Sequence, residues 1–106
     1  MTDLQERFDG IQQRMTASEG DVMEGNMMRS PGLKCRDKVF AFYHKERMGF
    51  RMGPQFDPEE FGLVDWGPLS PFKTKPPLKG WFMVGGGDVE AWEKLTGLAL
   101  EFTRSL

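Results

Sequence analysis

Few residues of this 106-residue chain could perform acid–base or nucleophilic chemistry. It holds one histidine, His44, and one cysteine, Cys35. His44 lies in the charged run HKER, which is typical of a solvated turn rather than a catalytic site. Together the two residues fall short of the usual ligands of a structural zinc ion. We therefore expect no catalytic residue, no metal, no cofactor and no enzymatic activity. A lone cysteine also excludes an internal disulfide, which favours a reducing, cytoplasmic location.

Two further motifs invite a chemical interpretation, but each has a simpler structural one. The glycine run at 85–87 precedes an expected helix, whose free amides could attract a phosphate. No Gly-Lys-Ser/Thr follows, and Asp88 would repel the anion, so we interpret the run as a hinge between a strand and a helix. The acid pairs at 59–60 and at 90 and 93 lie at expected helix starts, where carboxylates suit the helix dipole.

Charge is distributed unevenly along the chain, although its formal total is only −2. Residues 1–28 carry two basic and six acidic side chains, whereas residues 29–80 carry ten basic and six acidic ones. Residues 81–106 carry two basic and four acidic side chains. The middle of the chain is thus a basic zone between acidic ends, and such local charge matters more for the choice of partner than the total.

Two amphipathic helices are expected at the ends of the chain. Leu4, Phe8, Ile11 and Met15 recur at helical spacing, which predicts a helix over about residues 3–18. Asp88 is expected to cap a C-terminal helix with an apolar stripe at 89, 92, 95, 98, 99 and 102. A single helical turn is expected from the sequence Asp57-Pro58, with Gly62 ending it.

Strand-forming segments lie between these helices. We expect strands at 33–35, 38–44, 47–52, within 63–69 and at 80–84, because β-branched and aromatic residues or apolar alternation mark them. No bilayer-spanning apolar run is present, so no membrane association is expected. The sequence predicts one α+β domain over residues 1–106: an antiparallel sheet of about five strands with the N- and C-terminal helices packed on one face.

Strand register predicts which side chains share a face. With a turn centred on residues 45–46, positions 43, 41 and 39 face positions 48, 50 and 52. These six residues are apolar and should form the core beneath the helices: Val39, Ala41, Tyr43, Met48, Phe50 and Met52. The opposite face then combines aromatic rings with guanidinium groups from Phe40, Phe42, Arg47 and Arg51, beside Gly49.

The central motifs resemble those of a known family of small domains. The run GLKCRDKVFAF at 32–42, the MGFR at 48–51 and the KGWFMV at 79–84 are similar to motifs of MmcQ/YjbR-like and TfoX N-terminal-like domains. The resemblance spans residues 8–102. It implies a compact bacterial α+β domain without catalytic residues, and it includes a link to regulatory and DNA-binding roles. Asp37 stands where the family's turn often has glycine.

Three functional hypotheses follow from these observations. The leading one is a non-enzymatic domain that acts by self-association or by binding a partner protein. The first alternative is a nucleic-acid-binding module, since cations interleaved with aromatic rings can contact phosphates and stack bases. The second is a small-molecule cleft lined by Trp66, Phe72 and Trp81. The candidate binding residues for a partner or nucleic acid are Lys34, Arg36, Lys38, Phe40, Phe42, Arg47, Arg51, Lys73 and Lys75.

Overall fold

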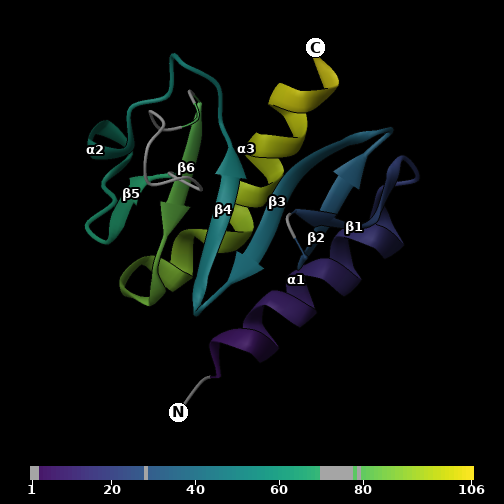
Figure 1. Cartoon of the computed structure of the whole chain (residues 1–106), viewed down its shortest axis with the longest axis horizontal. Coiled ribbons are helices and arrows are strands. Elements are labelled where there is room, and N and C mark those ends of the chain that lie inside the picture. The colour runs from purple at the N-terminus through teal and green to yellow at the C-terminus, as the bar shows by residue number, and fades with distance from the viewer. Residues whose placement is uncertain (1–2, 28, 70–77, 79) are drawn as a thin grey trace.

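The structure is a computed structural model that describes residues 3–27, 29–69, 78 and 80–106. All strand pairs are antiparallel, and the order across the sheet is β1-β2-β3-β4-β6-β5 (Figure 1). The elements in chain order are α1 (Leu4–Ser18), β1 (Val22–Met27), β2 (Ser30–Cys35), β3 (Lys38–His44), β4 (Arg47–Arg51), α2 (Pro58–Phe61), β5 (Trp66–Pro68), β6 (Trp81–Val84), the 3₁₀ helix η1 (Gly86–Ala91) and α3 (Trp92–Arg104).

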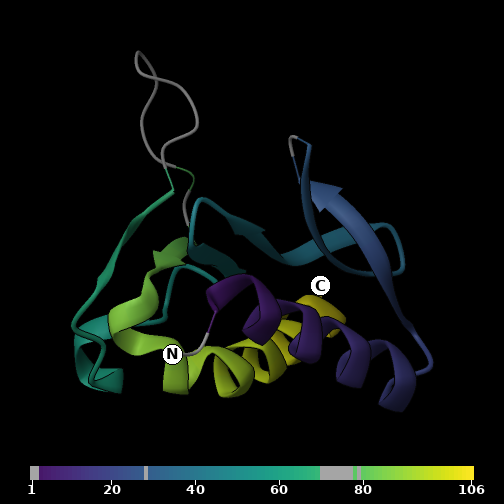
Figure 2. The ribbon, with the colours of Figure 1, turned by 90° about the horizontal axis from the view of Figure 1, so that it is seen from below.

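Both long helices pack on one face of the sheet, as predicted, and Figure 2 shows α1 and α3 together on that side. Phe8 and Ile11 of α1, and Trp92 and Leu95 of α3, are at most 1% exposed. They meet the strand residues of one continuous apolar core. Because burying each such side chain contributes about 1.5–3 kcal/mol, this layer is the main source of stability. No helix in the described part of the chain has the length and apolar character to cross a bilayer.

In the described residues the sheet has six strands rather than about five, and the additional one is β1. Its sequence, VMEGNM, contains Gly and Asn, which are depleted in strands. Pairing of Val22 with Cys35 begins the ladder to β2 and places Val22 in the helix-side core. Met23, the next residue, is 60% exposed. The strand therefore depends on pairing with β2 more than on intrinsic propensity.

Local capping sets two of the helix boundaries where the sequence predicts them. The Asp3 side chain accepts a hydrogen bond from the amide of Gln5 at 2.9 Å, which caps α1. Asp57 caps α2, and Gly62 ends it in the left-handed conformation with φ of 93°. The C-terminal helix differs from the prediction, because α3 begins at Trp92 after the short η1 helix and Asp88 is not its N-cap.

The β3–β4 hairpin has the predicted register. Ala41 pairs with Phe50, and Tyr43 pairs with Met48. The turn residues Lys45 and Glu46 have φ of 48° and 65°, which matches the twist required by a two-residue hairpin turn. Five of the six residues predicted to form the core do lie in the helix-side cluster: Ala41, Tyr43, Met48, Phe50 and Met52.

A β-bulge in the pairing of β2 with β3 reverses the predicted faces of Val39 and Phe40. Leu33 pairs with Ala41, whereas Lys34 pairs with Val39, so Phe40 is an extra residue in the ladder between β2 and β3. Phe40 turns into the helix-side core and is 0% exposed. Val39 instead packs against a small cluster on the opposite face. The prediction that Phe40 faces away from the helices and Val39 towards them is therefore wrong.

Candidate functional site

The sheet face opposite α1 and α3, called the open face below, is crossed by a row rich in glycine. Paired positions connect all six strands, and four of the six residues in the row lack a side chain. Since paired residues share a face, only the two other members project side chains here. In sheet order the row is Gly25, Gly32, Phe42, Gly49, Met83 and Gly67.

Phe42 uses the space that these glycines leave. A β-carbon at Gly49 would lie 2.5 Å from Cζ of the Phe42 ring, and one at Gly32 would lie 2.9 Å from the Phe42 Cβ. The ring centroids of Phe42 and Trp81 are 5.7 Å apart. Phe42 is 2% exposed and Trp81 is 9% exposed. With Leu69 they form a second, smaller core, against which three partly buried residues pack: Met27, Val39 and Met83.

Cationic side chains flank this small core on both sides of the glycine row. On one side, Lys34 pairs with Val39 and Arg51 pairs with Trp81. Both cations are half-buried. In the described part of the chain, neither has a carboxylate at ion-pair distance. Their charge is therefore available to an acidic partner.

The second cationic row lies on the other side of the glycines. His44 pairs with Arg47, and both residues are exposed. His44 Nδ1 lies 2.9 Å from Oγ of the buried Ser30, which holds the imidazole over β2. Arg47 Nη2 lies 4.0 Å from an Asp65 carboxylate oxygen, with half of its side chain still exposed. His44 is thus a surface residue of the open face, which the sequence did not indicate.

The structure brings some of the predicted binding residues together and separates others. Lys34, Phe42, Arg47 and Arg51 share the open face, although the ring of Phe42 is buried. Phe40 lies in the helix-side core. The remaining predicted residues are elsewhere: Arg36 is in the β2–β3 turn with φ of 59°, Lys38 pairs with the core residue Cys35, and Lys73 and Lys75 lie outside the described residues.

The methionines of the open face are not among the predicted binding residues. Met23 and Met27 occupy alternate positions of β1, and Met83 lies in the glycine row. Residues an even number apart share one face of a strand, so the spacing of Met23 and Met27 indicates a common face. This inference requires that β1 is first recognised as a strand. Thioether side chains adapt to the shape of a partner, and these three add an apolar component beside the cations.

The predicted aromatic cleft does not form between Trp66 and Trp81. Trp66 packs edge-on against Phe82, with ring centroids 6.0 Å apart, at the margin of the helix-side core. Trp81 belongs to the small core of the open face. The two indoles therefore lie on opposite faces of the sheet. Phe72, the third residue of that prediction, is outside the described residues.

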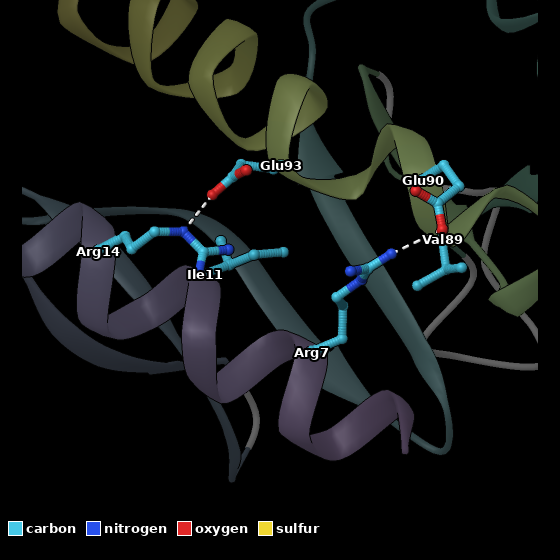
Figure 3. A pocket seen from close by; sticks show the side chains of 6 residues that line it. All are labelled: Arg7, Ile11, Arg14, Val89, Glu90 and Glu93. Atoms are coloured by element: carbon cyan, nitrogen blue, oxygen red, sulfur yellow. Dashed lines mark hydrogen bonds and ion pairs between the residues drawn. The ribbon is translucent and has the colours of Figure 1, made fainter. Parts of the chain in front are cut away.

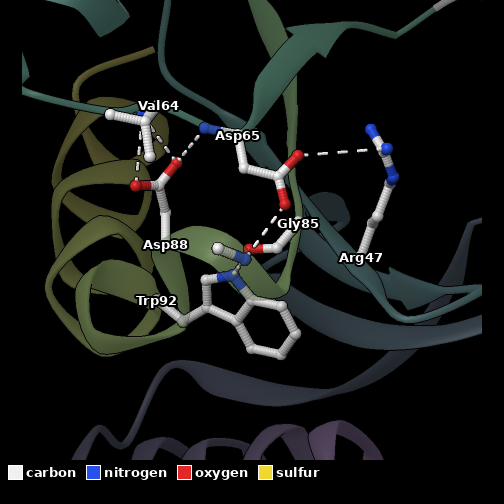
Figure 4. Close-up of polar contacts among 7 residues, drawn as sticks. Arg47, Val64, Asp65, Gly85, Asp88 and Trp92 are labelled. Carbon is white, nitrogen blue, oxygen red and sulfur yellow. Dashed lines mark hydrogen bonds and ion pairs between the residues drawn. The ribbon is translucent and has the colours of Figure 1, made fainter.

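The carboxylates of Asp65 and Asp88 connect the loop before β5 to the η1 helix that follows β6. The Asp88 carboxylate accepts hydrogen bonds from the amides of Val64 and Asp65, the shortest at 2.6 Å (Figure 4). In return, Asp65 Oδ2 accepts from the amide of Gly87 at 3.0 Å. A β-carbon at Gly85 would lie 2.7 Å from Asp65 Cγ. The glycines therefore allow close packing against Asp65, and this replaces the predicted hinge.

Asp21 connects the start of β1 to the end of α3. Arg104 donates two hydrogen bonds to its carboxylate, at 2.9 and 2.5 Å. These bonds hold the pKa of Asp21 well below its ordinary value and raise that of Arg104. The Cys35 thiol lies 3.3 Å from the same carboxylate, and burial together with this anion raises the pKa of the thiol. Cys35 is thus a structural thiol rather than an activated nucleophile.

A small hollow of about 90 Å³ lies between α1 and the start of α3. Figure 3 shows Arg7 and Arg14 reaching from α1 towards Glu90 and Glu93. Each arginine is paired with one of these glutamates, so the charges satisfy one another. Ion pairs this exposed contribute at most about 1 kcal/mol each. We interpret the two ion pairs around the hollow as structural contacts between the helices. In the described residues, no group of three His, Cys, Asp or Glu side chains could hold a metal ion.

Comparison with known proteins does not extend the list of candidate sites. No family model, curated protein or solved structure matches this chain. The resemblance to MmcQ/YjbR-like and TfoX N-terminal-like domains therefore stays a prediction.

Proposed function

We propose that this protein is a non-enzymatic binding module that docks an acidic segment of a partner protein on the open face of its sheet. The observation that carries the proposal is the position of Lys34, Arg47 and Arg51 around an apolar cluster, on the face that carries neither long helix. Apolar surface rimmed by charge is typical of protein interfaces. A cytoplasmic location in a bacterium belongs to the same proposal, since it depends on the single thiol and on the family resemblance.

The surface chemistry favours an acidic polypeptide over a nucleic acid. Base stacking needs accessible aromatic faces, yet Phe40 and Phe42 are at most 2% exposed. The accessible apolar groups of the open face include the thioethers of Met23, Met27 and Met83, of which Met23 is 60% exposed. Flexible thioethers beside cations suit a segment that alternates acidic and apolar side chains.

The experiment uses a fluorescein-labelled peptide that alternates Glu with Leu, followed by fluorescence anisotropy at low and at physiological salt. We expect the peptide to bind, and the affinity to fall as salt screens the charges. A peptide alternating Lys with Leu should not bind. Replacing both cations of the first row, Lys34→Glu with Arg51→Glu, should weaken binding of the acidic peptide by about tenfold or more, because attraction becomes repulsion at two positions.

A matched control separates the open face from net charge. Arg36→Glu with Lys38→Glu makes the same change in charge at a residue of the β2–β3 turn and at the position that pairs with the core residue Cys35. This control should bind the acidic peptide nearly as well as the wild type. Equal losses in both double variants would contradict the proposal, as would absence of binding at low salt. Tighter binding of a labelled thymine oligonucleotide than of the peptide would favour the nucleic-acid alternative.

A further inference from the structure

The two edges of the sheet differ in how open they are to a new strand. The edge strand β5 has three residues and ends in Pro68, which cannot donate a ladder hydrogen bond. The other edge strand, β1, has six residues and contains neither proline nor an inward-pointing lysine. Short strands, prolines and lysines are the usual means of protecting an edge. The β1 edge therefore has the length of a pairing strand and no proline or lysine, and its one charged residue is Glu24, opposite the core residue Leu33.

The side chains of β1 determine how it could pair with a second copy of itself. Val22 points to the helix side, so Glu24 and Asn26 follow it on that side, while Met23 and Met27 lie on the open face. Directly paired residues must share a face, which leaves two main symmetric registers. One places Glu24 opposite Glu24 of the second copy, and like charges directly opposite destabilise a ladder.

The second register has no such conflict. It places Gly25 opposite Gly25 of the second copy on the two-fold axis, with Glu24 opposite Asn26 and Met23 opposite Met27. The exposed thioether of Met23, which is 60% exposed in the single chain, then gains an apolar neighbour. The glycine row of the open face continues across the axis into the second copy.

We propose that the β1 edge pairs antiparallel with β1 of a second copy, in the Gly25-to-Gly25 register, to form a two-fold symmetric dimer with a continuous twelve-stranded sheet, twice the six strands of one chain. Because β5 is blocked at the far edge, the assembly closes at two copies. The two open faces lie on the same side of the joined sheet. The dimer does not use the cations of the proposed function, although both proposals use Met23 and Met27, so variants of the cations distinguish the two.

Sedimentation equilibrium of the whole chain, from micromolar to millimolar concentration, tests the dimer through the Glu24–Asn26 pairs. Asn26 is exposed, so either charge is tolerated by the fold. Asn26→Lys should tighten the dimer, and Asn26→Glu should weaken it, each by about three- to tenfold, because every dimer holds two such pairs. The same changes at the exposed Gln55, in the loop before α2, are the control and should leave the dissociation constant unchanged.

Cross-linking tests the register itself. Gly25→Cys should form a disulfide-linked dimer under mild oxidation, because the two residues face each other across the axis. Glu24→Cys should link far more slowly. A strictly monomeric chain at millimolar concentration would overturn the proposal. The β1 edge would then be a pairing site for a strand of another protein. A dissociation constant that does not change with the charge at position 26 would also overturn the proposal. So would faster disulfide formation through Glu24→Cys than through Gly25→Cys. Lys34→Glu with Arg51→Glu should not weaken the dimer.

Discussion

Replacing Gly49 by alanine is expected to destabilise the protein, although alanine is ordinarily preferred to glycine in a strand. The preference for alanine is worth roughly 0.5–1 kcal/mol. Against it stands the Phe42 ring, whose Cζ would lie 2.5 Å from the new β-carbon. Phe42 is 2% exposed and is held against Trp81, so the ring has little room to move. Overpacking of this kind costs about 1–3 kcal/mol, and we expect a net loss of about 1–2 kcal/mol.

Urea unfolding followed by tryptophan fluorescence measures this loss. A thermal melt should show a matching decrease of about 4–8 °C for each kcal/mol in a domain of this size. The control is Gly67→Ala in the same glycine row, where an added β-carbon meets no atom of the described residues within 4 Å. That variant should be as stable as the wild type or slightly more so.

A double-mutant cycle identifies the ring as the cause. Phe42→Leu shortens the side chain over Gly49, so Gly49→Ala should cost at least about 0.5 kcal/mol less in that background than in the wild type. An unchanged stability of Gly49→Ala would refute the account of the glycine row. Strictly additive effects of the two substitutions would show that Phe42 is not the group that meets the new methyl.

Three further predictions concern the polar contacts. The pKa of Asp21 is lower in the folded chain than its ordinary value of 3.8, so the stability it contributes is present above that pH and is lost as the pH falls below about 4. The stability advantage of the wild type over Asp21→Asn, measured by urea unfolding, should therefore be clear at pH 7 and shrink in acid; an advantage independent of pH would contradict this. The Cys35 thiol, 1% exposed, should react with a disulfide reagent far more slowly at pH 8 in the native chain than in urea, and equal rates would show that it is accessible. Asp88→Ala should cost about 1–3 kcal/mol of unfolding free energy because the amides of Val64 and Asp65 lose their acceptor, whereas Glu90→Ala, whose side chain is 89% exposed, should be nearly neutral.

Much of the fold follows from local sequence patterns. The apolar stripe from Leu4 to Met15 predicts α1. The Asp57-Pro58 start predicts α2. The β3–β4 hairpin register follows from its two-residue turn. These features depend on residues close in sequence, which is why their types and spacing are sufficient.

The features that depend on contacts distant in sequence escape prediction. Residues 39–43 are all apolar, so they carry no alternation from which the bulge at Phe40 could be detected. The strand β1 depends on its partner β2, since its own composition does not favour a strand. Asp88 has the position of a helix cap in the sequence, but the loop that carries Val64 supplies its donors.

The candidate site was predicted in part for the same reason. The sequence predicts the face of Arg47 and Arg51 correctly because the β4 register is local. The burial of Phe42 could not be predicted, because it requires Trp81 and Leu69 from distant segments. The glycine row is visible only once all six strands are aligned.

The most direct test of the account is a nuclear magnetic resonance titration of the ¹⁵N-labelled chain with the peptide that alternates Glu with Leu. We expect the shifted amides to gather on β1, β2, β3, β4 and β6 around Lys34, Arg47 and Arg51, and the α1 and α3 amides to stay unchanged. Shifts centred on the exposed sides of α1 and α3, or no shifts at millimolar peptide, would contradict the claim that the open face is the binding surface.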